Sequence, residues 1–356
     1  MVYGIGNENL SLSSVTIAFA YFNLIAMYTK VKALLFSCLV IVQAHAQEKP
    51  VNTAAATVAA SPMAPAELPG KGLVQHDFFY AGEGNKVVSI VKNGKQVWSY
   101  TDTARGEISD AALLANGNVL FAHQFGITMM TKDKKLLWKY DAPPNTEIHT
   151  ARPIGKDKVM YIQNGNTAKL VVVNIVSDKM LFEMPLQTGD PLKVHPQFRH
   201  AELTPAGTLL VAHMDLSKVC EYDDTGKITW QVDIPNPWYA ERLPNGNTLI
   251  TSNKNFVREV NPKGETTWEF TPADLPSIRF SGLQKSIRLA NGNTLIGNWA
   301  KKGDSTAVQA VEVSPDKKLV WALRSWNDPD LGRSTTIQVL DQPAIHPEKA
   351  HFGKFK

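Results

Sequence analysis

The stretch Glu241–Phe270, ERLPNGNTLITSNKNFVREVNPKGETTWEF, contains three short apolar runs separated by two turn signals. Asn245-Gly246 precedes the apolar pair Leu249-Ile250, and Lys263-Gly264 precedes Trp268. Asn-Gly between apolar runs is a strong hairpin signal, because a two-residue primed turn needs positive φ at both central positions. The stretch therefore predicts three short β-strands joined by tight turns.

The same pattern recurs along the chain, with a turn followed within a few residues by an aromatic side chain. Successive aromatic positions lie 38 to 53 residues apart. A period in the forties, with four short strands in each unit, is typical of β-propeller blades. We expect the repeated tryptophans to pack in the blades rather than to bind a ligand. The aromatic positions are Trp98, Trp138, Phe182, Trp230, Trp268 and Trp321.

The first and last repeats are incomplete, and together they predict one blade. Residues 76–100 give three strands of the first repeat, and residues 335–340 have the pattern of the missing innermost strand. We predict an all-β fold, a six-bladed β-propeller over residues 72–342 with four-stranded antiparallel blades. Pairing of the C-terminal strand into the first blade would close the ring and leave no free edge there. A seven-bladed ring is the alternative, and residues 343–356 are predicted to be a tail.

Residues 1–46 are predicted to be a signal-peptide region, with Met27 as an alternative start. Two lysines and an apolar run precede the small residues of Ala44-His45-Ala46, as in a secretory signal. Cleavage after Ala46 would leave the Ala- and Pro-rich residues 47–71 as a flexible linker. We therefore expect a secreted or periplasmic protein.

The alternatives to a cleaved signal are an apolar membrane anchor over Val15–Val42 and lipidation of Cys38. Removal of the signal would leave Cys220 as the one cysteine, so that no disulfide could form within the mature chain. Cys220 lies in a strand pattern, and we expect a buried structural thiol.

The composition and charge of the chain argue against nucleic acid as a partner. The chain is 44% hydrophobic and 20% charged, and its formal net charge of +4 comes without a dense Lys/Arg run. This balance is ordinary for a globular protein and does not favour nucleic-acid binding. We expect a monomer with no cofactor and no membrane span after signal removal.

Two segments carry a family resemblance. Asp223-Asp-Thr-Gly-Lys-Ile-Thr-Trp230 resembles the repeat of quinoprotein-like propellers. Arg242-Leu-Pro-Asn-Gly-Asn-Thr-Leu-Ile250, together with Val260-Asn-Pro-Lys-Gly-Glu-Thr-Thr-Trp268, is similar to the arylsulfotransferase-type repeat. The resemblance covers roughly residues 73–340 and implies the propeller fold. It also implies sulfuryl transfer through a histidine, His149 or His200, with oxyanion clamps at Arg152, Arg199 and Arg333.

If the strands of each blade are labelled A to D in chain order, the D–A and B–C loops share one face. This face contains five of the nine histidines. Imidazole titrates near neutral pH and can act as an acid, base or nucleophile, arginine and lysine pair with anions, and indole stacks on rings. The residues predicted to bind a ligand are His123, Arg152, Arg199, His213, Trp238, Tyr239, Lys285, Trp299 and Arg333, and those predicted to be catalytic are His149 and His200.

His149, His200 and His213 are the one alternative set of metal ligands, but no pair of them has a local ligand spacing, so we predict no metal. The leading hypothesis is a secreted or periplasmic propeller that binds an anionic ligand, either a glycan or a sulfated or carboxylated small molecule. The first alternative is an enzyme of the same fold, an arylsulfotransferase-like protein or a polysaccharide lyase or hydrolase that uses a histidine and Tyr239. The second is a scaffold for protein partners.

Overall fold

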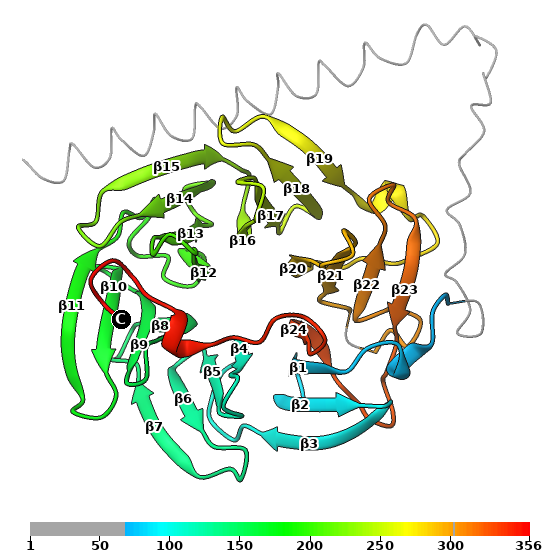
Figure 1. Ribbon diagram of the computed structural model, residues 1–356, viewed down its shortest axis with the longest axis horizontal. Helices are drawn as coiled ribbons and strands as arrows, with labels where there is room; N and C mark the ends of the chain where they lie inside the picture. The colour runs from blue at the N-terminus through cyan, green and yellow to red at the C-terminus, as the bar shows by residue number, and fades with distance from the viewer. Residues whose placement is uncertain (1–67, 302) are drawn as a thin grey trace, which may run out of the picture. The chain divides into compact units, whose positions relative to one another are not determined.

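The computed structural model describes residues 68–301 and 303–356, so the predicted signal region and most of the predicted linker lie outside the described residues. Within them the chain forms six sheets of four antiparallel strands, arranged as blades around a central axis (Figure 1). The predicted six-bladed propeller is therefore confirmed. None of the helices in this part of the chain is long and apolar enough to cross a membrane.

Each blade runs from an inner strand beside the axis to an outer strand at the rim (Figure 1). In that order the first two blades are β24 (Arg333–Val339), β1 (Phe78–Glu83), β2 (Val87–Lys92) and β3 (Lys95–Thr101), then β4 (Ile108–Leu113), β5 (Val119–His123), β6 (Gly126–Met130) and β7 (Leu136–Asp141). The third and fourth are β8 (Glu147–Ile154), β9 (Lys158–Asn164), β10 (Lys169–Asn174) and β11 (Lys179–Pro185), then β12 (Phe198–Leu203), β13 (Leu209–His213), β14 (Lys218–Tyr222) and β15 (Ile228–Asp233). The fifth and sixth are β16 (Pro237–Arg242), β17 (Thr248–Ser252), β18 (Phe256–Val260) and β19 (Thr266–Phe270), then β20 (Leu283–Arg288), β21 (Thr294–Asn298), β22 (Ala310–Val313) and β23 (Leu319–Leu323). Short 3₁₀ helices are η2 (Gly72–Val74), η3 (Pro272–Asp274) and η4 (Pro347–Lys349).

Pairing of β24 with β1 closes the ring, as the sequence predicted. The strands are antiparallel from Phe78 opposite Val339 to Glu83 opposite Arg333, with a bulge at Ala81/Gly82. The hydrophobic core is divided among the junctions between blades, because each buried cluster combines side chains of two neighbouring sheets. Closure therefore completes both a sheet and a core cluster, the one shared by the sixth and first blades.

The turn chemistry differs from the prediction at Asn245-Gly246. Gly246 has a φ of 87°, but Asn245 has no positive φ, and the amide of Leu243 donates to the carbonyl of Asn247. This is a three-residue loop in which glycine alone adopts the left-handed conformation, not a two-residue primed turn. A primed turn does occur at Asn93-Gly94, where both φ values are positive, 48° and 74°.

A hydrogen bond repeats between the outer strands. At four junctions a tryptophan in the fourth strand of a blade donates its indole N–H to a turn of the next repeat, and at a fifth Trp321 donates to the 3₁₀ helix η2 that precedes β1. The bonds run from Trp98 to Lys132 O (2.6 Å), Trp138 to Asp178 Oδ1 (3.2 Å), Trp230 to Pro262 O (2.9 Å), Trp268 to Pro315 O (2.8 Å) and Trp321 to Gly72 O (2.8 Å). The repeated tryptophans are thus structural, which is why they recur at the blade period.

The third blade has Phe182 at this position, and the C-terminal tail packs there instead. The rings of Phe352 and Phe355 lie 6.1 and 5.5 Å from that of Phe182, and both join the core cluster between the third and fourth blades. The amide of Lys354 donates to Asp224 in the turn of the fourth blade. In Figure 1 the tail, drawn in red, crosses the face that holds the A–B turns. The tail therefore takes over the joining role that the missing tryptophan has elsewhere.

Substitution Phe352→Ala is expected to destabilise the protein by about 3–5 kcal/mol, because the side chain is fully buried between two blades. The neighbouring His351→Ala, at a partly exposed side chain outside the core cluster, is the matched control and should cost at most about 1 kcal/mol. Urea denaturation followed by tryptophan fluorescence measures both values. Equal effects would show that the tail does not hold the two blades together.

Candidate functional site

A cavity of about 390 Å³ opens among the D–A and B–C loops, on the face opposite the C-terminal tail. Its wall combines side chains from five of the six blades, together with His195 in the loop between the third and fourth blades, because every inner strand starts at this end of the ring. The polar and aromatic side chains that line it include Glu83, Glu107, Ser109, His195, Arg199, Trp238, Asn253, Gln284 and Trp299. The site is therefore formed only when the ring has closed.

Two arginine–tryptophan pairs lie at this cavity, and both tryptophans line it. The guanidinium of Arg199 lies over the ring of Trp238 at 4.9 Å, and that of Arg333 lies over Trp299 at 3.9 Å. The indole N–H of Trp299 also donates to Glu83 Oε2 at 2.5 Å, while the buried N–H of Trp238 has no partner among the described residues. Cation–π contacts of this kind hold an indole in one orientation. The cavity thus has two fixed aromatic side chains, each beside a positive charge.

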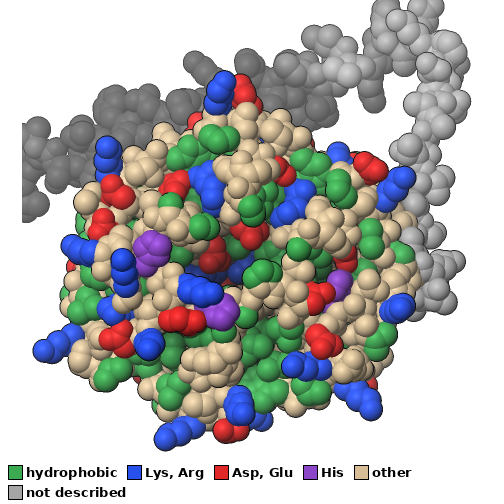
Figure 2. Space-filling model, viewed as in Figure 1, with side chains coloured by type: hydrophobic (Ala, Val, Ile, Leu, Met, Phe, Trp, Pro, Cys, Tyr) green, Lys and Arg blue, Asp and Glu red, His purple; other side chains and the backbone are tan. Residues whose placement is uncertain are grey.

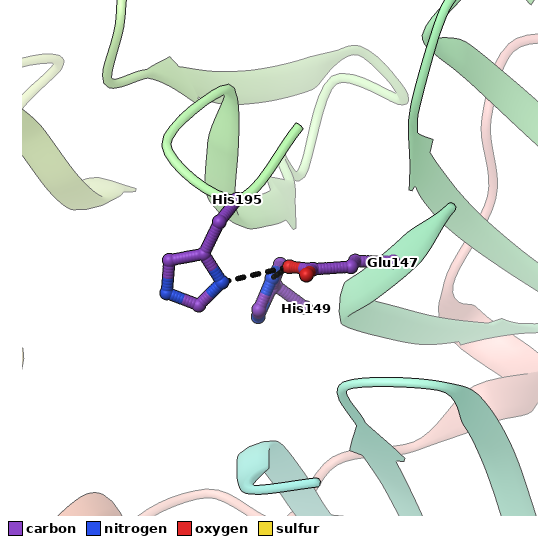
Figure 3. Close-up of side chains that lie close together, drawn as sticks. All are labelled: Glu147, His149 and His195. Atoms are coloured by element: carbon purple, nitrogen blue, oxygen red, sulfur yellow. Dashed lines mark hydrogen bonds and ion pairs between the residues drawn. The ribbon is translucent and has the colours of Figure 1, made fainter. Parts of the chain in front are cut away.

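Glu147, His149 and His195 lie together at the edge of this cavity, at the start of β8 and in the loop before β12 (Figure 3). His149 Nε2 and His195 Nδ1 both donate to Glu147 Oε2, at 2.8 and 2.7 Å. Burial alone would raise the pKa of Glu147, but these two hydrogen bonds hold it below its ordinary range. Arg199 Nη2 donates to His195 Nε2 at 2.8 Å, so both ring nitrogens of this half-exposed histidine are engaged.

A polar chain continues behind His149. Ser109 Oγ lies 2.9 Å from His149 Nδ1 and 3.3 Å from Glu107 Oε1. The imidazole is 1% exposed, and burial together with the nearby Arg199 charge lowers the pKa of His149 to about 3. His149 is therefore neutral at pH 7, with each ring nitrogen directed at one oxygen.

A second layer of charge lies deeper along the inner strands. Arg152 donates to Asp110 Oδ2 and, at 3.0 Å, to Glu202 Oε2, which also accepts from the hydroxyl of Tyr239 at 3.3 Å. Lys285 Nζ lies 3.5 Å from Glu202, so two cations face two carboxylates. Burial opposes ionisation of Asp110, but Arg152 and the adjacent His200 hold the pKa of Asp110 well below its ordinary range. Seen from the opposite face, Figure 2 shows acidic and basic side chains in the hollow at the middle of the ring.

The structure places the predicted site residues in three groups. Arg199, Trp238 and Trp299 line the cavity, and Arg333 packs on Trp299 at its edge. His149 lies in the polar chain behind the wall, and the deeper layer contains Arg152, His200, Tyr239 and Lys285. His123 and His213 do not line the cavity.

Several residues of the site were not predicted to bind a ligand. They are Glu83, Glu107, Ser109, Glu147 and His195. Glu107, Glu147 and His195 fall in D–A loops that the sequence assigns to this face, so loop position was the signal that could have found them. Glu83 is the last residue of β1, a position that no sequence motif marked as part of the site.

His213 and His123 are buried within their own blades. Tyr222 and His213 Nε2 are hydrogen-bonded at 2.9 Å, and the His213 ring packs edge-on against Phe198 with centroids 4.7 Å apart. Burial lowers the pKa of His213 to about 4. Burial also lowers the pKa of His123, whose ring nitrogens have no partner among the described residues. The positions of both histidines fit packing in the neutral form.

No protein-family model matches the sequence, and no curated protein matches it either. Among solved structures, a protein of unknown function from Bacteroides caccae is similar, with 24% identity and a TM-score of 0.65, over 74% of this chain and 97% of that chain. A streptogramin B lyase structure is similar over 72% of this chain and 86% of that chain, with 12% identity and a TM-score of 0.51. Identities this low show a shared β-propeller fold and no more.

The stability of the protein should fall as the pH drops from about 6.5 to 4, partly through His213. In the unfolded chain His213 has its ordinary pKa of about 6.5, whereas in the folded protein its pKa is about 4. Between these pH values the unfolded chain therefore binds a proton at His213 and the folded protein does not. In His213→Asn we expect the slope of unfolding free energy against pH to be shallower by about 1 kcal/mol per pH unit. Urea titrations at intervals between pH 4 and 8 measure the slope. Identical slopes in the two proteins would contradict the buried neutral state of His213.

Proposed function

We propose that this chain binds an anionic carbohydrate, or a related ring compound carrying a carboxylate or sulfate, in the cavity between the D–A and B–C loops. The observation that carries the proposal is that Trp238 and Trp299 line one cavity together with the buried guanidinium of Arg199. A volume of about 390 Å³ lies within the usual range for small-molecule sites. Aromatic side chains supply apolar contact with a ring, and arginine supplies a planar donor for an acidic group.

The polar groups of the wall suit hydroxyl groups of a sugar. Glu83, Glu107, Asn253 and Gln284 offer acceptors and amide donors on different sides of the cavity. Arg199 Nε is buried without a partner in the described part of the chain, and the N–H of Trp238 is in the same state. Unpaired buried donors cost free energy, so a ligand that accepts from them gains affinity. Two free donors beside two aromatic rings favour a ligand with acceptor oxygens.

The predicted signal region supports a role outside the cytoplasm, where such glycans are found, and we extend the proposal to a secreted or periplasmic location. The arylsulfotransferase-like resemblance supports a second candidate, an enzyme that acts on the bound ligand. In that case His195 is the better acid–base candidate, because it lines the cavity and its side chain is 50% exposed. His149 and His200, the residues predicted to be catalytic, are each 1% exposed.

Trp238→Ala is expected to weaken binding about tenfold or more, because it removes one of two rings without leaving a known hydrogen-bond partner unpaired. Isothermal titration calorimetry with uronate-containing and sulfated oligosaccharides measures the affinity, and neutral oligosaccharides of the same length test the role of charge. His351→Ala, on the opposite face, is the control and should bind as the unaltered protein does.

Failure of every acidic oligosaccharide to bind the unaltered protein would overturn the proposal and favour the protein-scaffold alternative. Binding that survives unchanged in Trp238→Ala would place the ligand elsewhere. Product formation from a bound oligosaccharide, lost in His195→Gln, would establish the enzyme.

A further inference from the structure

We propose that Glu147, His149 and His195 form a binding site for a divalent transition metal of the zinc type, with an open coordination position toward the cavity. Two imidazoles and one carboxylate are a common ligand set for a catalytic zinc ion. Among residues 68–301 and 303–356, these three make the one such group whose donor atoms all lie within 4.8 Å of one another. The site does not depend on the carbohydrate proposal, because metal binding can be measured without any sugar.

The donor atoms already face a common point (Figure 3). Glu147 Oε2 is 2.8 Å from His149 Nε2 and 2.7 Å from His195 Nδ1, and the two rings are nearly perpendicular with centroids 5.2 Å apart. In a tetrahedral site with bonds of about 2.0–2.1 Å, the ligand atoms are roughly 3.3 Å apart. A metal ion would therefore replace the two protons now shared with Glu147, and the two contacts would lengthen by about half an ångström.

The surroundings of His149 are those of a metal ligand. With a metal on Nε2, its Nδ1 carries the proton and donates to Ser109 Oγ, which in turn donates to Glu107 Oε1. Such outer partners fix the tautomer and orientation of a ligating histidine. Ser109 and Glu107 also both line the cavity.

His195 completes the set from a different blade junction. His195 lies in the loop before β12, whereas Glu147 and His149 lie at the start of β8. The three ligands therefore form no local sequence motif. Because His195 is half-exposed and lines the cavity, the open side of the three ligands faces the cavity. Nitrogen donors favour zinc and its transition-metal neighbours over magnesium or calcium, which prefer oxygen ligands.

The hydrogen bond from Arg199 to His195 competes with metal binding at His195. Arg199 Nη2 donates to His195 Nε2 at 2.8 Å, and that nitrogen must carry a proton when Nδ1 binds a metal as neutral imidazole. Metal loading therefore requires the arginine to release His195, or the half-exposed ring to turn and present Nε2. A competition of this kind predicts that removing the guanidinium strengthens metal binding.

The test uses the full-length protein, freed of metal with a chelator and then titrated with Co²⁺ and, in competition with a chromophoric chelator, with Zn²⁺. We expect one ion per chain and the visible absorption bands of low-coordinate cobalt. His195→Gln and Glu147→Gln should each weaken binding more than 100-fold, and Ser109→Ala about tenfold through the outer partner. Arg199→Met should bind more tightly than the unaltered protein. The control is His346→Gln, which removes an exposed histidine that is also paired with a glutamate.

Absence of a stoichiometric ion in the unaltered protein would overturn the proposal. So would equal affinity in His195→Gln, a half-exposed loop residue whose replacement leaves the core intact. Weaker binding in Arg199→Met would overturn the assigned competition and with it the role of His195 as a ligand. Loss of metal binding in His346→Gln would move the site to the opposite face.

Discussion

The hydrogen bond from an outer-strand indole to a turn of the next repeat is the contact on which the ring depends. Adjacent sheets of a propeller touch through apolar side chains, which resist separation but set orientation weakly. A directional bond at the rim, as from Trp268 to Pro315 O, fixes how far each blade turns relative to its neighbour. Four of the six junctions use it, at a fifth Trp321 donates to η2 instead, and Phe182 with the tail rings of Phe352 and Phe355 serves the sixth. When the angle between each pair of neighbouring blades is fixed, β24 lies beside β1 in the register that pairs the two strands.

Fixed blade angles explain why a site exists at one end of the axis. The inner strands converge there, five of the six contribute side chains near their first residues, and residues at or after the ends of second strands add others. Glu83, Glu107, His195, Trp238 and Trp299 come from five different blades but share one wall. No pair of them is close in sequence, so the cavity is a product of ring closure and not of any local motif.

The sequence was sufficient for the architecture because each element of it has a local cause. Turn residues and the indole period predict the blades, and the unpaired C-terminal strand pattern predicts closure. The face of the site also followed, since strand alternation assigns every loop to one side. The depth of each side chain along the axis could not be predicted from the sequence. His149 and His200 both lie near the start of an inner strand, but His149 lies behind the wall of the cavity, whereas His200 contacts Asp110 in the deeper layer. Glu107 and Glu147 were placed on this face but not among the predicted site residues, because an acidic residue in a loop is ordinarily solvated, and only the fold shows that Glu147 accepts from two histidines.

The deeper layer explains how a wall rich in carboxylates can hold its shape. Asp110 and Glu202 are buried with Arg152 and Lys285, and such pairs contribute little net stability because desolvation offsets attraction. Their value lies in position, since Arg152 joins three neighbouring inner strands, β4, β8 and β12, through two carboxylates. Burial raises the pKa of the nearby Glu241 to about 7, so this carboxyl is only partly ionised at neutral pH. The two cations and two carboxylates of this layer balance, so the layer beneath the cavity adds no net formal charge from these four groups.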